Sequence, residues 1–460
     1  MSDCVMEAHA ELSALSEDYA RELVSIGRSD FNGFSLDSIP DYLGRALEMN
    51  QAVPLIVGEE FLDNFETLSL QIGSLLLDVP RRYAINDLEF ASRFYGFNQT
   101  DKAYDALVQY GSYDTDMYRL DLINGAGGFK VLEVNMGGAA SGFYGSTWLD
   151  LYASIPFTEA FLDKHNKDLD TKNTIEMFFR HTLKQSASLK EVQASKQINF
   201  FIKAPDDSRS SINEYLTYYL NLLGQEFGLN AHLVLREIGA EVTLKDGFAY
   251  IGDERIDVYI KADGDICVAL YEAYKLGNVH IYDGISGFFS GNKRNMALVT
   301  SQRVDEYYTD EERAILDKYV PWTAMMSQTE LVYQGQVVNP AELAIRDKDS
   351  FVLKGADCHS GVNVFVGRFM TQSEWQKEVE SHIGAEDWLL QAYCESKPYI
   401  MLDSQLGFVK HEVVWGSFIV ADQAAGGTLR MKPMETTDGV VNYSRNATES
   451  LFCTLVDRDN

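Results

Sequence analysis

The chain has 460 residues, of which 46% are hydrophobic and 23% are charged, so it can build a large core of ordinary globular composition. Its 69 acidic residues outnumber its 39 basic residues, which gives a formal net charge of −30. A surface this negative repels nucleic-acid phosphates and anionic membranes, so neither is expected as a partner. An anionic substrate would need a local group of lysines and arginines.

The cysteines favour a reducing compartment. They are odd in number and scattered, and none forms a CxxC pair; they are Cys4, Cys267, Cys358, Cys394 and Cys453. A disulfide framework or a zinc site is therefore not expected. The N-terminal residues lack the pattern of a signal peptide, and no apolar stretch reaches the length of a membrane span. We expect a cytoplasmic protein.

Residues 1–100 are predicted to be mostly helical. Apolar side chains recur at helical spacing over 7–26 and again over 59–77. Pro54 and Pro80 are expected to interrupt the helical segments. One more helix is predicted over 101–110. Apolar stripes of this kind usually face the core, so we assign them no chemistry.

Residues 118–143 hold a group of polar side chains at strand spacing. Arg119 and Asp121 are two residues apart, as are Glu133 and Asn135, so each pair faces one side of a strand. The turn-rich segment 124–128 between them predicts a hairpin. Four residues are expected to form its apolar face: Leu120, Leu122, Leu132 and Val134.

Two interpretations of this hairpin remain open on spacing alone. Carboxylate and amide oxygens are hard ligands of the kind that Mg²⁺ takes, together with substrate phosphates. Arg119 beside them could hold a phosphoryl oxygen. The alternative is a solvated hairpin with a surface ion pair, because sheets with one polar face are common.

An α/β alternation is predicted after the hairpin. Residues 137–143 are small, so their backbone could approach a phosphate or carboxylate, or form a plain loop. Residues 157–192 are expected to be helical. Strands over 198–202, 231–235, 247–250 and 256–260, with a helix over 211–227, predict a small, mainly parallel sheet. No GxGxxG follows the first strand, so a dinucleotide has no support.

Two lysines of the second half have suitable positions for binding phosphate. Lys293 follows a glycine turn at the start of a predicted helix, where it could reach a phosphate or remain a surface residue. Lys354 ends a predicted strand over 350–354, and a loop and a strand over 362–366 follow. This is no Walker A motif, because GxxxxGK[ST] is missing. A helix over 373–383 and strands over 388–393, 409–420, 428–432 and 439–442 complete the prediction.

The hairpin motif resembles that of a known family. R-x-D over 119–121, with E-x-N beginning at Glu133, is similar to the magnesium-binding signature of circularly permuted ATP-grasp enzymes, of which glutathionylspermidine synthetase is the best-known relative. The resemblance implies an α/β (α+β) fold of circularly permuted ATP-grasp type. Its expected parts are a mostly helical N-terminal region (1–100), an ATP-grasp part with the hairpin (101–195), a Rossmann-like pre-ATP-grasp unit (196–300), a lid (301–400) and C-terminal strands (401–460).

The resemblance also implies roles for the residues that match. Asp121, Glu133 and Asn135 would bind Mg²⁺, while Lys293 and Lys354 would hold the phosphates of ATP.

The segment after Lys354 is similar to the G-R-E-G-A-N-V loop of these enzymes, because Gly361, Asn363 and Val364 match. His359 and Ser360, which stand where that loop has Arg and Glu, would face the phosphates together with Gly361. Because the family's Arg is absent, a protonated His359 could supply the basic phosphate contact, or a neutral His359 could donate one hydrogen bond.

The remaining expected contacts lie near the C-terminus. Gln391, Ala392 and Tyr393 occupy the positions of the hinge that binds the adenine edge through its backbone. Glu395 could accept a hydrogen bond from the ribose, or be an ordinary exposed glutamate.

The resemblance places two arginines at the reaction centre. Arg119 and Arg430 are expected to act in catalysis, and Asn442 could face the same centre. Arg430 could equally be an ordinary strand arginine.

The implied activity is an ATP-dependent carboxylate–amine ligase. It would form an amide through an acylphosphate and release ADP and phosphate, with a small carboxylate (amino acid or peptide) and an amine as substrates. Two alternatives stay open: a phosphotransferase that forms no amide, and a non-catalytic nucleotide-binding protein. A protein nucleophile is not required, and GxSxG and HExxH are absent.

Overall fold

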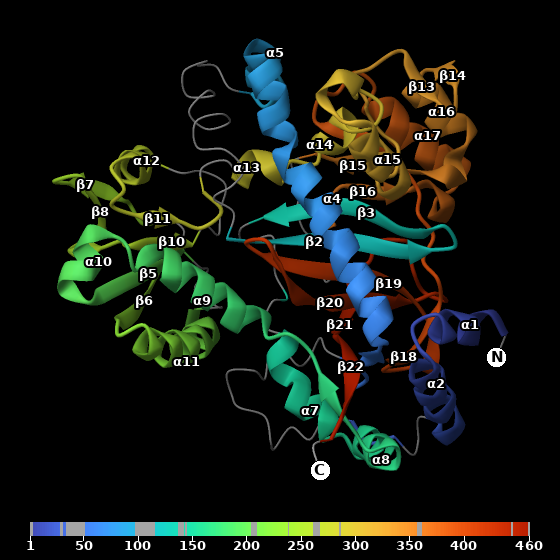
Figure 1. The fold of residues 1–460 in the computed structure, drawn as a ribbon. Coiled ribbons are helices and arrows are strands. Elements are labelled where there is room, and N and C mark those ends of the chain that lie inside the picture. The colour runs from blue at the N-terminus through green and yellow to red at the C-terminus, as the bar shows by residue number, and fades with distance from the viewer. Residues whose placement is uncertain are drawn as a thin grey trace.

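The computed structural model describes residues 3–27, 31–33, 51–96, 116–136, 142, 145–203, 209–237, 239–260, 267–284, 287–356, 361–442 and 445–458. It is a mixed α/β fold with several sheets (Figure 1). The predicted helix over 101–110 lies outside the described residues, as do His359 and Ser360.

The centre of the molecule is an antiparallel sheet of six strands, called the central sheet below. Its strands are β2 (Met117–Gly125), β3 (Gly128–Met136), β18 (Tyr399–Asp403), β19 (Gly407–Val420), β20 (Gln423–Pro433) and β21 (Thr448–Ser450). The order is β21-β20-β19-β2-β3, and β18 also pairs with β19. The predicted hairpin of the first half therefore pairs with the C-terminal strands, which brings residues about 300 positions apart side by side.

A long helix covers the apolar face of this sheet. Helix α4 (Glu59–Asn86) crosses in front of the sheet in Figure 1, and its Phe65 packs on Trp415 of β19, with 5.7 Å between the ring centroids. Gly73 lets the helix approach the sheet, because a Cβ there would lie 2.4 Å from the hydroxyl of Tyr118. The helix continues through Pro80, so the predicted interruption at that residue is wrong. Burial of this face outweighs the lost backbone hydrogen bond.

A bulge changes the predicted apolar face of the hairpin. The pairing of β2 and β3 shifts between Asp121 and Leu122, so that Leu122 pairs with Val131 rather than with Leu132. Val131 is fully buried, whereas Leu132 is only partly buried. The prediction that Leu132 belongs to the apolar face is therefore wrong, because one extra residue turns the following side chains over.

A parallel sheet lies in the middle of the chain, as predicted, but the strand predicted over 247–250 is not part of it, because it pairs within a separate antiparallel sheet. The parallel sheet has the order β11-β10-β5-β6, and all its pairs are parallel. Its strands are β5 (Gln197–Lys203), β6 (Asn230–Arg236), β10 (Val258–Ile260) and β11 (His280–Ile281). Helices α9 (Thr174–Ser186), α10 (Lys190–Ser195), α11 (Arg209–Glu226) and α12 (Val268–Lys275) surround it, and β7 (Thr243–Lys245), β8 (Phe248–Ile251) and β9 (Glu254–Arg255) form a small separate sheet.

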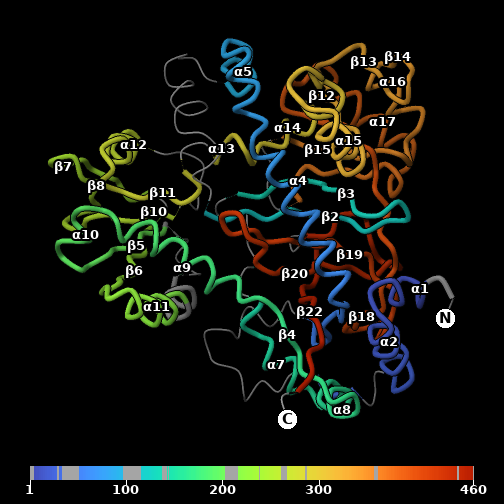
Figure 2. The backbone as a smooth tube through the Cα atoms, in the orientation of Figure 1, coloured from blue at the N-terminus to red at the C-terminus, as the bar shows by residue number. Residues whose placement is uncertain are grey.

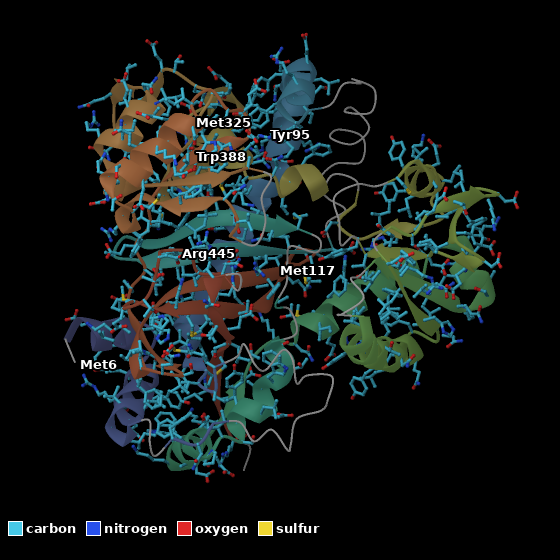
Figure 3. The ribbon with its side chains drawn as sticks, turned by 180° about the vertical axis from the view of Figure 1, so that it is seen from behind. Met6, Tyr95, Met117, Met325, Trp388 and Arg445 are labelled. Atoms are coloured by element: carbon cyan, nitrogen blue, oxygen red, sulfur yellow. The ribbon has the colours of Figure 1, made fainter. Side chains whose placement is uncertain are left out.

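A third unit contains the small antiparallel sheet, with the order β12-β17-β15-β16. Its strands are β12 (Thr323–Met325), β15 (Phe351–Gly355), β16 (Val364–Val366) and β17 (Trp388–Ala392), accompanied by the hairpin β13 (Leu331–Tyr333) and β14 (Gln336–Val338). Helices α14 (Asn295–Leu298), α16 (Pro340–Arg346) and α17 (Gln372–Ser381) pack against it, whereas α15 (Asp310–Tyr319) packs against α4 and β3. Figure 3 shows Met325 and Trp388 inside this unit, seen from behind.

The remaining helices and strands are found at several places around these sheets. They are α1 (Asp3–Ala10), α2 (Ala14–Ile26), β1 (Leu55–Ile56), α5 (Leu88–Phe94), α7 (Leu149–Ala153), α8 (Pro156–His165), β4 (Lys167–Asp170), α13 (Gly287–Ser290) and β22 (Phe452–Asp457). Strand β22 pairs with β1 and β4, and Figure 2 shows β22 and β4 side by side near the C-terminus.

Three other predicted elements differ from the structure. The helix over 7–26 is two helices, because Ser13 caps the start of α2 by accepting from the N–H of Ser16. The helical segment over 157–192 contains β4, since Asn166 ends α8 with a left-handed φ of 50°. Residues 439–442 form no strand, because Gly439 has a φ of 77° and sits against the ring of Phe369.

Among the described helices, none combines the length and the apolar character that crossing a bilayer requires.

Candidate active site

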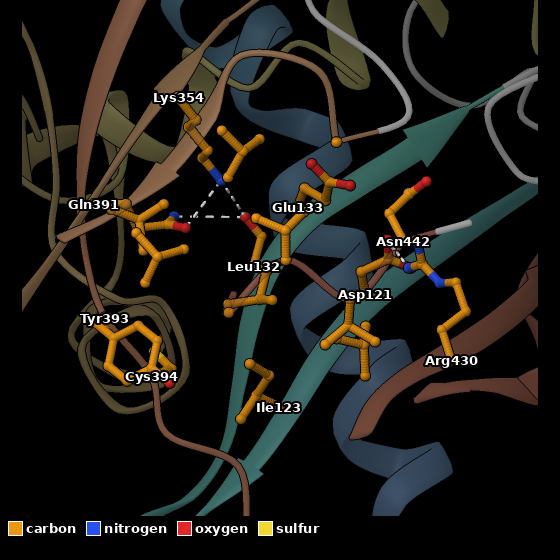
Figure 4. Close-up of a pocket in the computed structure, with 18 of the residues that line it drawn as sticks. Asp121, Ile123, Leu132, Glu133, Lys354, Gln391, Tyr393, Cys394, Arg430 and Asn442 are labelled. Atoms are coloured by element: carbon orange, nitrogen blue, oxygen red, sulfur yellow. Dashed lines mark hydrogen bonds and ion pairs between the residues drawn. The ribbon is translucent and has the colours of Figure 1, made fainter. Parts of the chain in front are cut away.

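A cavity of about 380 Å³ lies between the central sheet and the small antiparallel sheet (Figure 4), which is within the size range of small-molecule sites. One wall is the polar face of the hairpin β2–β3 with Arg430 of β20. The other wall comes from strands β15, β16 and β17, and from residues 439–442. Because α4 covers the opposite face of the central sheet, strand periodicity separates the apolar core from the polar cavity.

Asp121 is the anchor of the polar face. Its carboxylate accepts hydrogen bonds from Nε of Arg119 at 2.7 Å, from Nη2 of the same arginine at 3.2 Å and from Nδ2 of Asn135 at 2.9 Å, and it also pairs with Arg430. All four residues are buried. Burial alone would raise the pKa of Asp121, but the two guanidinium groups outweigh it and hold that pKa well below its usual range.

Glu133 is the carboxylate that faces the cavity. Its Oε2 lies 3.5 Å from Nζ of Lys293, and its Oε1 lies 3.4 Å from Nδ2 of Asn135. Its side chain keeps 23% of its surface exposed, in contrast to 3% for Asp121. Burial acts to raise the pKa of Glu133, yet the positive charges of Lys293 and Lys354 lower it overall, so this group is ionised at neutral pH.

Lys354 is held by two oxygens on opposite walls. Its Nζ donates to Oε1 of Gln391 at 2.9 Å and to the carbonyl oxygen of Leu132 at 3.1 Å, as the dashed lines in Figure 4 show. That carbonyl belongs to the bulged part of β3. Gln391 is fixed in turn, because its Nε2 donates to Oγ1 of Thr323 at 3.0 Å. Burial lowers the pKa of Lys354 to about 8, despite the nearby charge of Glu133.

Four basic and three acidic side chains thus line one cavity, which leaves an excess of positive charge there in a chain that is strongly acidic. Clefts of one sign attract ligands of the opposite sign. The cations come from four separate parts of the chain, near residues 119, 293, 354 and 430, so only the fold brings them together. The arrangement can bind a multiply charged anion such as a polyphosphate.

The three residues expected to bind Mg²⁺ lie together, and their carboxylate and amide oxygens are of the kind that this ion takes. Nδ2 of Asn135 lies 2.9 Å from Oδ2 of Asp121 and 3.4 Å from Oε1 of Glu133. Glu133 is the most open of the three, and Mg²⁺ usually takes only one or two protein carboxylates beside substrate oxygens. Because Asp121 already forms ion pairs with Arg119 and Arg430, Glu133 and Asn135 would be the principal ligands of the ion.

The residues expected around the nucleotide fall into two groups. Gly361, Gln391, Ala392 and Tyr393 line the cavity. Glu395 is not among its lining residues; it is exposed and pairs with Arg368 at 3.0 Å.

The strand geometry limits how the hinge positions could bind a base. The N–H of Ala392 donates to the carbonyl of Trp322, and the N–H of Tyr393 donates to that of Ser350, each at 2.8 Å. These two donors are therefore already used within the sheet. The prediction for Gln391 concerned its backbone only. Its side chain accepts a hydrogen bond from Nζ of Lys354.

Sequence reasoning missed two acidic residues of this sheet face. Glu412 lines the cavity from β19 and is buried, and burial raises its pKa. Glu449 lies on β21 beside Arg430. The sequence signal for Glu412 was its position directly before the apolar run that begins at Val413, whereas its pairing with Lys432 is visible only in the structure. Glu449 carried none, since β21 has only three residues.

Comparison with known proteins supports this architecture. No family model matches the sequence, and no curated protein does. The fold, however, is similar to that of a solved structure. The structure of a glutathione synthetase-like effector from Globodera pallida superimposes with a TM-score of 0.56 at 12% identity, covering 96% of this chain and 97% of that chain. A provisionally named gamma-glutamylcysteine synthetase from Methylobacillus flagellatus gives a TM-score of 0.43 at 12% identity, covering 82% and 87%.

Proposed function

We propose that the chain is an ATP-dependent carboxylate–amine ligase of the ATP-grasp type. One observation carries the proposal: lysines and arginines from distant segments converge on Glu133, Asp121 and Asn135 in a single cavity between two sheets. The likeness in fold to a glutathione synthetase-like protein agrees with it. A site that must stabilise a transferring phosphoryl group needs such positioned charge more than it needs a nucleophile.

The residues divide the chemistry between them. Lys354 and Lys293 would bind oxygens of the β- and γ-phosphates, and Arg119 would hold the substrate carboxylate in line with the γ-phosphorus. An oxygen of that carboxylate bonds to the γ-phosphorus while the bond to the β-phosphate oxygen breaks, which gives an acylphosphate and ADP. Mg²⁺ on Glu133 and Asn135 would neutralise phosphate charge when it is bound.

Amide formation completes the reaction. The amine nitrogen bonds to the acyl carbon and loses a proton, and the carbon–oxygen bond to phosphate breaks, so that phosphate leaves. Arg430, which lines the cavity, would stabilise the oxyanion of the tetrahedral intermediate. The cavity lies between two sheets, which helps to keep water from the acylphosphate.

An ADP-release screen tests the proposal. The purified chain is incubated with ATP, Mg²⁺ and pairs of amino acids, small peptides and amines. We expect ADP release with at least one pair, dependent on both partners, and its loss in Glu133→Gln, which keeps the shape of the side chain but removes its charge. ADP release that needs the carboxylate but no amine would indicate a phosphotransferase instead.

A further inference from the structure

Glu412 brings a third carboxyl group to the cavity, at a distance from the other two. It lines the cavity from β19. Because side chains alternate along a strand, it shares a face with Gly416, which pairs with Asp121 of β2. The four residues between the two positions on β19 correspond to about 13 Å at the usual rise of a strand. Glu412 therefore lies well along the sheet from the group around Asp121.

The cavity is apolar between these two positions. Ile123 of β2 (Figure 4) and Val414 of β19 are paired there, one position on from Asp121 and one before Glu412 on the same face. The opposite wall adds three valines: Val352, Val366 and Val440. A ligand in this cavity thus meets charges first, then an apolar section, and then a carboxyl group.

One oxygen of the Glu412 carboxyl group is occupied and the other is available. The hydroxyl of Thr437 donates to Oε1 and itself accepts from the N–H of Gly439, the latter at 2.9 Å. Lys432, the cation opposite on β20, donates to Asp438 at 2.6 Å instead. Oε2 has no partner among the described residues and keeps accessible surface, although Glu412 is only 6% exposed. A buried carboxyl oxygen normally accepts a hydrogen bond, so this one is suited to a ligand.

Glu412 also lies close to the strand β17 at the other wall. Burial, and next the negative charge of Glu412, raise the pKa of Tyr393 to about 12. The backbone N–H groups of Ala392 and Tyr393 already donate within the sheet. The polar edge of a ligand at this end therefore needs another partner, and Oε2 of Glu412 is an acceptor in the right place.

We propose that Oε2 of Glu412 accepts a hydrogen bond from the exocyclic amino group of adenine and thereby selects ATP among purine nucleotides. A nucleotide whose phosphates lie between Lys293 and Lys354 has its groups in the order of the cavity: charged phosphates, a flat ring with apolar faces, and a polar ring edge. Adenine presents a donor at this edge, whereas guanine presents a carbonyl oxygen. A carboxylate attracts the donor and repels the oxygen. The inference rests on the proposed function, because it names the base of the nucleotide that the ligase would use.

Nucleotide binding without the other substrates tests the selection. ATP and inosine triphosphate, which has a carbonyl oxygen in place of the amino group, are titrated with Mg²⁺ into the chain by calorimetry. The wild type binds ATP at least about tenfold more tightly. In Glu412→Gln the preference inverts, because Thr437 keeps the amide oxygen and the new amino group faces the base. Glu330→Gln, which changes an exposed glutamate directly before β13, keeps the preference of the wild type.

A second variant keeps the test open if Glu412→Gln does not fold. Glu412→Asp retains the charge but withdraws the oxygens by one methylene group, so ATP loses at least about fivefold in affinity and inosine triphosphate does not. A variant that merely disturbed the fold would weaken both nucleotides alike.

Equal affinities of the wild type for the two nucleotides, or equal losses of both in each variant, overturn the inference. A preference for ATP over deoxy-ATP that Glu412→Asp abolishes, without any preference over inosine triphosphate, overturns it too, because the carboxyl group would then contact the ribose. ADP release that persists in these cases leaves the ligase proposal standing, whereas a wild type that binds no nucleotide contradicts both.

Discussion

Removing the carboxylate of Asp121 should damage the fold more than the loss of a surface ion pair would. In Asp121→Ala, Arg119 and Arg430 keep their charges in a buried place but lose the group that balances them. The side chains of the three residues are 3–7% exposed, so water cannot replace it. Breaking a buried pair by removing one partner costs about 3–5 kcal/mol.

A matched exposed pair provides the comparison. Asp168 accepts from Nε of Arg458 at 2.8 Å, which is nearly the distance between Arg119 and Asp121, but its side chain is 56% exposed. Exposed pairs contribute about 0–1 kcal/mol. We therefore expect Asp168→Ala to leave the free energy of unfolding almost unchanged.

Urea unfolding of the two variants measures the difference. The assay is made near pH 7, where the contribution of Asp121 is complete. Because its pKa is lowered in the folded chain, that contribution is present above the unfolded pKa of about 3.9 and is lost only as the pH falls through the lower folded value. A loss below about 1 kcal/mol in Asp121→Ala, equal to that of the control, would refute the view that this carboxylate balances two buried arginines.

Three further predictions concern the lysine, the glutamine and the glycine of the site. ATP binding to the free protein, measured by titration calorimetry, should weaken as the pH rises through about 8, because Lys354 is protonated below its pKa and neutral above it. In Lys354→Arg the loss of ATP affinity should move to higher pH, because arginine stays charged. Gln391→Leu should weaken ATP binding about tenfold or more, because Lys354 loses an acceptor, while Gln391→Glu should restore part of it and raise the pH at which binding declines. Gly416→Val should reduce ADP release without unfolding the chain, because even a Cβ there would lie 2.9 Å from Cδ of Arg119 and would displace that side chain. Circular dichroism checks the fold. Unaltered ADP release would contradict the placement of Arg119 at the reaction centre.

Local patterns were sufficient for the parts of the fold that depend on neighbours in sequence. The period of two in R-x-D and E-x-N predicted that the four side chains share one face, and the register places Arg119 opposite Asn135 and Asp121 opposite Glu133. The α/β alternation after residue 196 predicted the parallel sheet for the same reason, since each strand and helix has its own periodicity.

Features set by long-range contacts were not predictable in this way. The bulge that moves Leu132 out of the core depends on pairing between strands, and the residue types of β3 do not indicate it. Pro80 stays inside a helix because the helix packs on a sheet built largely from the C-terminal half. Gln391 was predicted through its backbone, but its side chain holds a lysine 37 positions away in sequence. Glu449 joins this sheet face only because β21 pairs with β20, which places it opposite Arg430.

The most direct measurement is the binding of a non-hydrolysable ATP analogue with Mg²⁺ by titration calorimetry. The wild-type chain should bind it, and Lys293→Met should weaken the affinity at least about tenfold, because this variant removes a cation that faces Glu133 in the cavity. Lys245→Met, which removes an exposed lysine of β7, should bind as the wild type does. Absence of binding to the wild type, or equal affinities in the two variants, would contradict the assignment of this cavity to a nucleotide.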